Sequence, residues 1–576
     1  MKQKITFYLF YFLFISFLQS QSVNWVEHFG GASEDVLKSA TIDANGNTYS
    51  TGYFAENSTF SNIELNAIGY FNSFVTKTDA TGKILWAKSL AQPNDDDIDD
   101  YHSVITKSIA VDASGNIIIA GYFDAGEFDA DPGEGEYILS AANYEMFIIK
   151  LDENGNFIWA QSFGSSTNSF ESVSEIDVDA NGNIYLTGYF SDSISISHAA
   201  GTSVITSYGG SDIFVMKYYA DGSFLWMKHM GSEDADLGMS LDVSDSGDVF
   251  VTGRISATAT FYTPMFFGDP VTINVNEGYN SSFALKLDSS GDFIDVVEVG
   301  EADSENTGTS IALDLDGYAY VTGYYGGILV INEGTDNEMS IDSDTNYEGY
   351  VAKVDFTNEN ISWIKEIDGG TDSVFGYTVD TDSNNNIYVG GFFSETLTVG
   401  DYSLTRNTSK ALESYLVTLD NSGEFLGAYQ YGGLNSVDGQ TLVININDDI
   451  LLAGSFSGNV DISPFETEDL EITSNGYRDN YLVTTNMNQV LSNPDNKFIN
   501  GLKVYPNPSE DVILISSELN LKGSRYFIFD VSGKSVLSGK LTENKEVSIN
   551  HLDKGLYFLQ IIKENNQQQT LKIIKK

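Results

Sequence analysis

The feature that most constrains the fold of this chain is a hairpin pattern that recurs over most of its length. In DANGNIYLTGYF, residues 179–190, the pair Asn181-Gly182 favours φ > 0 at both central positions of a tight turn. Aligned on the second glycine of the pattern, seven copies occur, at Gly52, Gly121, Gly188, Gly253, Gly323, Gly391 and Gly454. Such a chain is expected to stack one repeated structural unit.

A second pattern alternates with the first and predicts another hairpin in each unit. Its copy FIIKLDENGNFIWAQS, residues 147–162, combines a strand, an Asp-x-x-Gly turn and a strand that contains tryptophan. Each unit therefore has four antiparallel strands. Ile184 and Leu186 fall on one face of their strand and Tyr185 on the other, so both faces carry large side chains. The predicted fold is all-β, a seven-bladed β-propeller over residues 21–490.

The ends of the repeat predict how the ring closes. The last unit has a third strand at residues 481–486 but no clear fourth, whereas VNWVEHFGG, residues 23–31, matches the fourth-strand pattern. We therefore expect the N-terminal strand to complete the last blade, which removes exposed sheet edges. The tryptophans share one position of the unit, which favours packing between blades over the alternative, a row of sugar-stacking platforms: Trp25, Trp86, Trp159, Trp226 and Trp363.

Charge and composition exclude several classes of partner. With 82 acidic and 29 basic residues, the chain has a formal charge of −53, which repels nucleic acid and anionic membranes. The absence of cysteine excludes disulfides, a thiolate nucleophile and a lipid anchor on cysteine. Residues 1–20 have two lysines followed by an apolar run, the pattern of a signal peptide. We expect no transmembrane segment after its removal, and a monomer.

Acidic loops are the candidate metal sites. FDADPGEGE, residues 128–136, gathers carboxylates in a loop that proline and glycine can bend, and its candidate Ca²⁺ ligands are Asp129, Asp131 and Glu134, with Glu136 beside them. NDDDIDD, residues 94–100, is more typical of a solvated segment. The stretch that begins at Asp179 lacks the spacing of a calcium loop and predicts a turn. No other cofactor is expected.

No catalytic residue can be assigned from the sequence. The five histidines form no HExxH motif, and neither GxSxG nor GxxxxGK[ST] occurs. A pair of carboxylates for glycoside cleavage stays open, because the fold sets their separation. The connections between the second and third strands vary most, as in residues 55–73 and 254–282. A ligand is therefore expected to meet these loops first.

The repeat, D-x-x-G-N-x-Y-x-T-G-Y-F with F-x-x-K-x-D-x-x-G-x-x-x-W, resembles the bacterial β-propeller repeat family known as SBBP and, more distantly, NHL-type repeats. That family implies the fold only, since propellers of this kind serve many functions.

After a linker at residues 491–501, the tail at 502–576 alternates like a small β-sandwich. It resembles the type A C-terminal sorting domain of the type IX secretion system, through V-Y-P-N-P at 504–508, D-V-S-G-K at 530–534 and K-G-L-Y-F-L-Q-I at 554–561. The resemblance implies contact with the type IX secretion machinery and export from a Gram-negative bacterium. Removal of the tail, with release or attachment to surface lipopolysaccharide, would follow.

Together these features favour a secreted or cell-surface protein that binds a glycan or a protein, for adhesion or nutrient capture, over an enzyme. The alternatives are an extracellular hydrolase or lyase that acts on polysaccharide, and a purely structural surface protein. Carboxylates with raised pKa at the central opening would favour the enzyme. A shallow face rimmed by aromatic residues would favour binding.

Overall fold

The computed structural model divides the chain into two compact units, Met1–Gln489 and Val490–Lys576. The expected signal peptide, the linker at 491–501, the acidic loop at 94–100 and the tail motif at 530–534 lie outside the described residues. The structure describes residues 23–68, 70–92, 103–165, 171–256, 259–261, 271–273, 279–302, 305–332, 335–343, 346–406, 412–433, 438–463, 470–486, 503–509, 511–516, 521–522, 524–529, 535–542, 545–552, 554–562 and 568–576.

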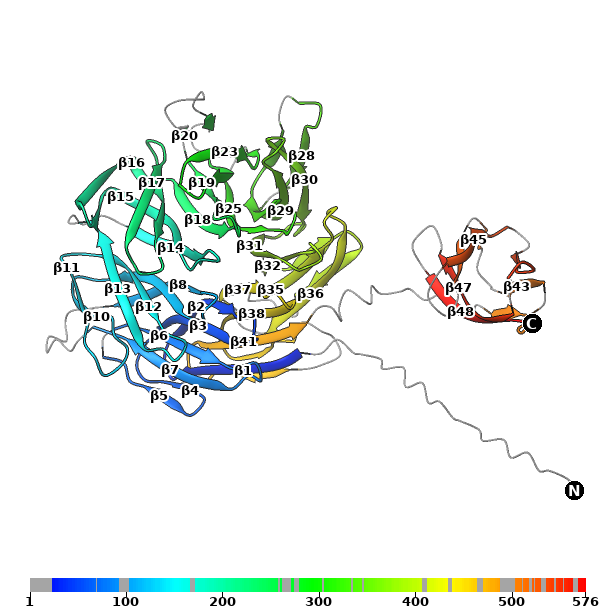
Figure 1. Cartoon of the computed structure of the whole chain (residues 1–576), viewed down its shortest axis with the longest axis horizontal. Helices are drawn as coiled ribbons and strands as arrows, with labels where there is room; N and C mark the ends of the chain where they lie inside the picture. Colours follow the sequence, from blue (N-terminus) through cyan, green and yellow to red (C-terminus); the bar gives the residue numbers. More distant parts are fainter. Residues whose placement is uncertain are drawn as a thin grey trace, which may run out of the picture. The chain divides into compact units, whose positions relative to one another are not determined.

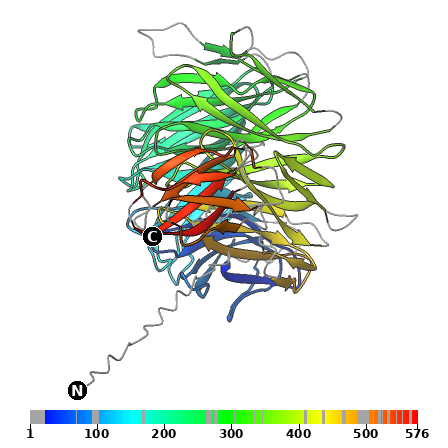
Figure 2. The ribbon, with the colours of Figure 1, turned by 90° about the vertical axis from the view of Figure 1, so that its right-hand side faces the viewer.

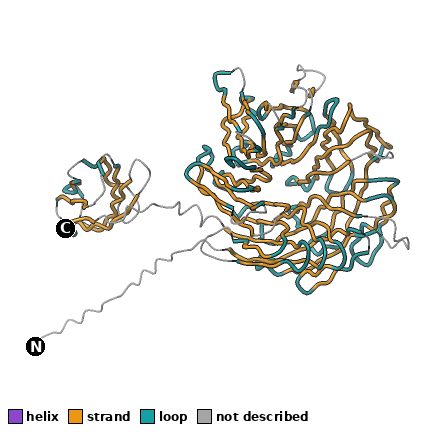
Figure 3. The backbone as a smooth tube through the Cα atoms, turned by 180° about the vertical axis from the view of Figure 1, so that it is seen from behind, coloured by secondary structure: helices purple, strands orange, loops and turns teal. Residues whose placement is uncertain are grey.

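The described part of the first unit is built from β-strands, and Figure 3 shows strands and loops without a helix. Within these residues we find no helix that could span a membrane. The main strands form groups of four that are antiparallel and consecutive in the chain, apart from one N-terminal strand.

The groups, each given from its first to its fourth strand, are β2 (Asp35–Ile42), β3 (Thr48–Phe54), β6 (Asn72–Thr78) and β7 (Ile84–Leu90); β8 (Val104–Val111), β9 (Ile117–Phe123), β12 (Glu145–Leu151) and β13 (Phe157–Gly164); β14 (Glu171–Val178), β15 (Ile184–His198), β16 (Gly201–Tyr218) and β17 (Phe224–Met230); β18 (Leu237–Val243), β19 (Val249–Ile255), β22 (Ser281–Leu287) and β23 (Phe293–Glu298); β25 (Asn306–Leu313), β26 (Ala319–Tyr325), β29 (Glu348–Asp355) and β30 (Asn360–Ile367); β31 (Val374–Thr381), β32 (Ile387–Phe393), β35 (Glu413–Leu419) and β36 (Phe425–Gly433); and β37 (Asp438–Ile444), β38 (Asp449–Phe456), β41 (Asp479–Asn486) and β1 (Val23–Gly31).

The first strands of the groups lie around a common centre (Figure 1). Each contacts the first strand of the next group, from β2 and β8 onward, and β37 contacts β2. Figure 2 shows the same strands from the side. The arrangement is propeller-like.

The N-terminal strand β1 lies in the last group. It pairs antiparallel with β41, with Trp25 opposite Thr484 and His28 opposite Tyr481. The sheet order is β37-β38-β41-β1, so β41 has hydrogen-bonded neighbours on both sides. The strand at residues 23–31 therefore occupies the place where a fourth strand of this group was expected.

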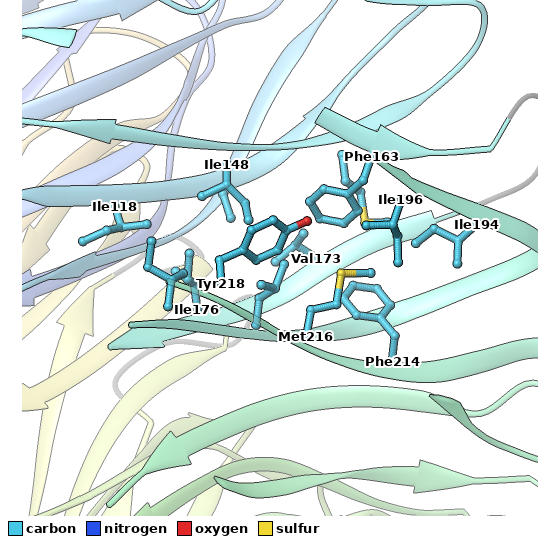
Figure 4. Close-up of a cluster of buried hydrophobic side chains, with 14 of the residues drawn as sticks. Ile118, Ile148, Phe163, Val173, Ile176, Ile194, Ile196, Phe214, Met216 and Tyr218 are labelled. Atoms are coloured by element: carbon cyan, nitrogen blue, oxygen red, sulfur yellow. The ribbon is translucent and has the colours of Figure 1, made fainter. Parts of the chain in front are cut away.

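Hydrophobic clusters lie between consecutive groups. The cluster in Figure 4 joins Ile118 and Ile148 of the second group to Val173 and Phe214 of the third. Ile184 and Leu186 belong to the same cluster, whereas Tyr185 packs in the next one, against β18, β19 and β22. The strand therefore buries both faces, as its alternation predicts, and the burial of large side chains on each face holds the groups together.

The hairpin turn differs in one respect from the sequence prediction. Gly182 has a positive φ of 75°, but Asn181 does not, so the expectation of φ > 0 at both residues was wrong. The Asp179 carboxylate accepts hydrogen bonds from the backbone N–H groups of Asn181 and Asn183, both at 2.9 Å. These bonds hold Asn181 in the right-handed region and leave the left-handed conformation to glycine alone. The loop is a tight turn, as predicted.

Each tryptophan packs on a glycine of the next group. The indoles lie against the glycine of the following Asp-x-x-Gly turn, in the pairs Trp25 and Gly82, Trp86 and Gly155, Trp159 and Gly222, Trp226 and Gly291, and Trp363 and Gly423. The Trp159 Nε1–H also donates to the Ala220 carbonyl at 3.3 Å. The tryptophans thus join neighbouring groups, which favours the packing interpretation over sugar-stacking platforms.

The Gly222→Ala variant tests this contact, and Gly317→Ala is its matched control. The two glycines have φ of 84° and 85°, so alanine is equally strained in both backbones. A Cβ at Gly222 would lie 2.8 Å from Trp159 Cδ2, whereas among the described residues no heavy atom lies within 4 Å of one at Gly317. We expect Gly222→Ala to cost about 1–3 kcal/mol more than Gly317→Ala by chemical denaturation. Equal losses would contradict the contact.

A small accessory hairpin follows the second strand in most groups, where sequence variation had indicated irregular loops. These hairpins are β4 (Ser58–Phe60) with β5 (Ile63–Leu65), β10 (Gly126–Asp129) with β11 (Ile138–Ala141), β20 (Ala259–Phe261) with β21 (Val271–Ile273), β27 (Ile328–Ile331) with β28 (Met339–Asp342), β33 (Thr396–Val399) with β34 (Tyr402–Thr405) and β39 (Asn459–Asp461) with β40 (Glu471–Thr473). In the third group, β15 and β16 continue outward instead.

The accessory hairpins also connect neighbouring groups. Gly30 of β1 pairs with Thr59 of β4, Gly432 of β36 pairs with Asp461 of β39, and Ala91 forms a bridge with Asp129. In each case a hairpin hydrogen-bonds to the chain that leaves the preceding group. The irregular sequence between the second and third strands therefore has an architectural role.

The C-terminal unit has two antiparallel sheets. One contains β42 (Lys503–Tyr505), β43 (Val512–Ser516) and β46 (Glu546–Ser548), and the other β44 (Arg525–Phe529), β45 (Ser535–Lys540), β47 (Gly555–Ile562) and β48 (Gln568–Lys575). Their apolar residues, among them Ile513, Ile528, Leu559 and Ile573, share one buried cluster. This unit has the character of the expected small β-sandwich.

Candidate functional site

One end of the strand groups carries the variable connections. Because successive strands are antiparallel, the connection from the second to the third strand lies at the same end as the connection from one group to the next. We call this the loop end. The first strand of each group runs away from it, towards the turn that follows.

A β-bulge occurs in all seven of the first strands, at the same place in six of them and one residue earlier in the last. The bulged residues are Lys38, Lys107, Ser174, Met239, Thr309, Tyr377 and, in the last strand, Gly439. Bulges re-aim a side chain, and they are common beside functional sites. Three of these side chains lie over an aromatic ring of their own group: Lys38 Nζ is 5.3 Å from the Tyr53 ring, Lys107 Nζ is 5.6 Å from Tyr122, and the Tyr377 and Phe392 rings are 5.1 Å apart.

These aromatic residues belong to a recurring position at the loop end. The residue after the aligned glycine of each second strand is Tyr53, Tyr122, Tyr189, Arg254, Tyr324 or Phe392 in the first six groups. We call these six residues the mouth ring. Burial, aided by Asp124 and by the neighbouring Tyr144, Tyr53 and Tyr189, raises the pKa of Tyr122 to about 12. The tyrosines of the first three groups are thus close enough to interact.

Further aromatic residues surround the mouth ring. Tyr53 contacts Phe71 at 4.7 Å between ring centroids, and Tyr122 contacts Tyr144 at 6.0 Å. Tyr324 lies 5.1 Å from Phe375. Tyr377 is 47% exposed and Tyr144 44%. The loop end therefore presents aromatic side chains that remain accessible to a ligand.

Four carboxylates lie farther along the first strands, beyond the bulge. We call Glu175, Asp177, Asp242 and Asp380 the central carboxylates. Each accepts a backbone N–H of the first strand in the next group: Glu175 from Leu241 at 3.0 Å, Asp177 from Val243 at 3.0 Å, Asp242 from Leu313 at 2.8 Å and Asp380 from Ile444 at 2.6 Å. These bonds satisfy donors that no strand partner reaches.

Burial raises the pKa of each central carboxylate. Burial raises the pKa of Glu175 to about 7, and the Asp242 charge adds to the shift. Burial also raises the pKa of Asp380 to about 7, with Asp242 and Glu175 acting in the same direction. Burial followed by the Asp242 charge raises the pKa of Asp177 well above its usual range. The four side chains keep part of their accessible surface, so water reaches them.

The position of Glu175 does not need a carboxylate in the other groups. At the corresponding position, four of them have a serine: Ser39, Ser108, Ser240 and Ser310. Their hydroxyls accept the same kind of backbone N–H from the next group. Ser39 Oγ accepts the Ile109 N–H at 3.3 Å, and Ser240 Oγ accepts the Ile311 N–H at 3.1 Å. A carboxyl group at the Glu175 position therefore exceeds what the architecture requires.

The candidate Ca²⁺ ligands lie in and beside the β10–β11 hairpin. Asp129 Oδ1 accepts the backbone N–H groups of Asp131 at 3.0 Å and Tyr137 at 2.9 Å, and Asp131 Oδ1 accepts that of Gly133 at 2.8 Å. Asp461 holds the β39–β40 hairpin in the same way, at 3.0 Å from both Ser463 and Leu470. The loop geometry thus explains Asp129 and Asp131 without an ion.

Within the described residues, no group of three or more histidine or carboxylate side chains is arranged to hold a metal ion. Calcium binding by Asp129, Asp131 and Glu134 stays a prediction. The mouth ring and the central carboxylates were not singled out from the sequence. The tyrosine of the repeated T-G-Y-F was a visible signal for the first of these sites. The central carboxylates have no local signal in the sequence, because they come from three different strand groups.

Residues 503–576 match the family model described as the secretion system C-terminal sorting domain. These residues are a C-terminal sorting domain. The sorting domain indicates a protein that is secreted or carried to the cell surface. It contains β42 to β48 and the buried cluster between their two sheets.

The rest of the chain is similar to known proteins at low identity. An uncharacterized WD repeat-containing protein of Acanthamoeba polyphaga mimivirus is 22% identical over 453 residues, which is 68% of this chain and 32% of that protein. The chain spans about a third of the length of that relative.

Several solved structures align with the chain, and two of them are a propeller and a polysaccharide lyase. The Dos1 propeller has 8% identity and a TM-score of 0.35, covering 80% of this chain and 94% of that one. A polysaccharide lyase, the PL25 ulvan lyase, has 11% identity and a TM-score of 0.36, covering 76% and 93%.

Proposed function

We propose that the chain is a secreted or cell-surface binding protein, whose first unit is a seven-bladed β-propeller closed by its N-terminal strand, and that it holds a glycan at the mouth ring. The four-stranded groups, the contact between β37 and β2 and the pairing of β1 with β41 support the closed ring. The sorting domain supports export, for which the partner is the type IX secretion machinery.

The observation that carries the binding function is the contrast between the two ends of the groups. At the turn end, the repeated residues hold turns and neighbouring groups, as Asp179 and Trp159 do. At the loop end, aromatic residues beside the mouth ring keep accessible ring surface, as Tyr144 and Tyr377 do. Aromatic side chains that surround the opening of a circle of sheets can stack on the apolar faces of sugars.

A glycan array probed with the full chain tests this proposal. Tyr377 and Tyr219 are equally exposed, at 47% and 46%, but Tyr219 lies in the turn that joins β16 to β17, at the end opposite the loops. We expect Tyr377→Ala to weaken binding about tenfold, the value of one aromatic contact, and Tyr219→Ala to leave it unchanged. Equal behaviour of the two variants, or capture of proteins alone, would overturn glycan binding at this end.

A second candidate function is cleavage of polysaccharide, which the central carboxylates favour. Protonated and ionised carboxyl groups coexist there near neutral pH, as acid and base catalysis requires. A reducing-sugar release assay on the glycans that bind separates the two functions. Release by the full chain that is lost in Asp380→Asn would establish the enzyme, and binding without release would leave the chain a binding protein.

A further inference from the structure

The cations of the loop end are unusual for so acidic a chain. Lys38, Lys107 and Arg254 stand in the first, second and fourth groups, either at the bulge or in the mouth ring. Between them lie the rings of Tyr53, Tyr122 and Tyr189. Over four consecutive groups, positive charges therefore alternate with aromatic faces.

Two of these cations have no anionic partner in the described part of the chain. No ion pair of these residues involves Lys107 or Arg254. Arg254 Nε is buried and has no hydrogen-bond partner there, and a buried donor left unpaired is costly. With 82 acidic residues in the chain, a guanidinium without a carboxylate points to an anion that comes from outside.

The two lysines stand at the bulges of neighbouring first strands, β2 and β8, which contact each other. Burial, together with the nearby Lys38 ammonium, lowers the pKa of Lys107 to about 8. Each ammonium lies over a tyrosine ring, and for Lys107 this geometry holds the cation without neutralising it. Arg254 in turn lies near enough to Tyr189 to influence its hydroxyl. One anionic ligand that spans these groups would relieve the repulsion between the lysines and pair the arginine.

We propose that the loop end of the first four groups binds an anionic polysaccharide, whose carboxylate or sulfate groups contact Lys38, Lys107 and Arg254 while its sugar rings stack on Tyr53, Tyr122 and Tyr189. This inference rests on the proposed function and names the class of its glycan. Guanidinium and ammonium groups suit both kinds of anion.

The net charge of the chain does not prevent this binding, but it does select the ligand. At physiological ionic strength, charges more than about 8 Å away are largely screened. The nearby cations therefore dominate the electrostatic potential that a ligand meets at the loop end. Asp124, beside Tyr122, is an opposing charge. A nucleic acid needs many phosphate contacts for its affinity. Three cations supply too few such contacts, which favours an acidic polysaccharide over a nucleic acid.

The test uses the full chain, isothermal titration and four probes: polygalacturonate for carboxylate, a carrageenan for sulfate, dextran as a neutral glycan and polyaspartate as an acidic peptide. We expect binding to one or both anionic glycans that weakens as salt rises. Lys107→Met and Arg254→Met should each weaken it at least about tenfold. Methionine keeps the apolar packing of either side chain, and an unchanged melting temperature verifies folding.

Lys228→Met is the matched control, because Lys228 pairs with Asp292 at 3.3 Å near the turn end, and its loss should not affect binding. If the chain binds dextran equally well and tolerates Lys107→Met and Arg254→Met, the anionic class is overturned while glycan binding stands. If polyaspartate binds as tightly as the glycans, the ligand class is also overturned. If no glycan binds, both proposals fail together.

Discussion

Removing residues 23–29 is expected to lower the melting temperature of the chain by about 5 °C or more. The deletion removes most of β1, whose Phe29 is 1% exposed and whose ring lies 4.9 Å from Phe60 and 5.7 Å from Phe74. Loss of two aromatic side chains and a row of backbone hydrogen bonds costs on the order of 5 kcal/mol or more. A unit of this size has an unfolding entropy of roughly 1 kcal/mol/K, so the loss corresponds to a shift of about 5 °C or more.

Differential scanning calorimetry of the chain with and without residues 23–29 measures this effect, with both proteins lacking the leader. The free edge of β41 should also promote association, which size-exclusion chromatography detects. Adding a peptide of residues 23–31 in trans should recover part of the lost stability, because its register with β41 is fixed by Trp25 and His28. An unchanged melting curve would mean that β1 does not hold the ring.

Raising the pH from 5 to 8 is expected to lower the melting temperature by roughly 5 °C. The folded pKa values of Glu175 and Asp380 are raised to about 7 from about 4 in the unfolded chain. A carboxyl group with a raised folded pKa favours the folded state while it is protonated, and that advantage is lost as the pH rises through 7. Burial acts in the same sense on Asp35 and Glu171, with pKa values of about 7 and 8.

The turn aspartates give the opposite dependence at lower pH. Burial opposes the shift at Asp179, but the hydrogen bonds from Asn183 and Asn181 prevail and lower its pKa. Its contribution to stability is therefore present above pH 4 and is lost as the pH falls further. The melting temperature should pass through a maximum near pH 5, because the two kinds of carboxyl group titrate on either side of it.

Glu175→Gln separates the local effect from the repulsion of the whole chain. Glutamine keeps the acceptor for the Leu241 N–H and removes the charge. The decrease in unfolding free energy between pH 5 and pH 8 should therefore become smaller by about 1 kcal/mol. Glu64→Gln removes an exposed charge from β5 and should leave the slope unchanged. Measurements in 0.5 M NaCl suppress the general repulsion. A slope that vanishes in salt would contradict the local explanation.

The strand framework could be predicted from the sequence because it repeats. The aligned glycines, the tryptophans and the alternation at Ile184, Tyr185 and Leu186 are determined by backbone conformation and by packing between neighbours. The aspartate that begins the hairpin turn, Asp179 in the third group, also repeats. Only the predicted conformation of Asn181 was wrong. That error arose because a carboxylate two residues earlier competes with the intrinsic preference of the Asn-Gly pair.

The accessory hairpins and both parts of the candidate site could not be predicted. Strands as short as β4 carry too few residues for a periodic signal, and they exist because the preceding group offers a hydrogen-bonding edge. Glu175 and Asp380 lie in strands of different groups, and they come together only when the groups assemble. The exposure of Tyr377 depends on a bulge, which a sequence pattern does not reveal.

The pairing of β1 with β41 has a mechanical consequence. The chain continues from β41 towards the sorting domain, so any pull between a surface attachment on the C-terminal side of β41 and a captured ligand enters the ring through this strand. Because β38 and β1 flank it and run antiparallel to it, the load acts along the strands and must shear two ladders of hydrogen bonds at once. Such a clamp resists tension far better than an edge strand, which can be peeled away one bond at a time.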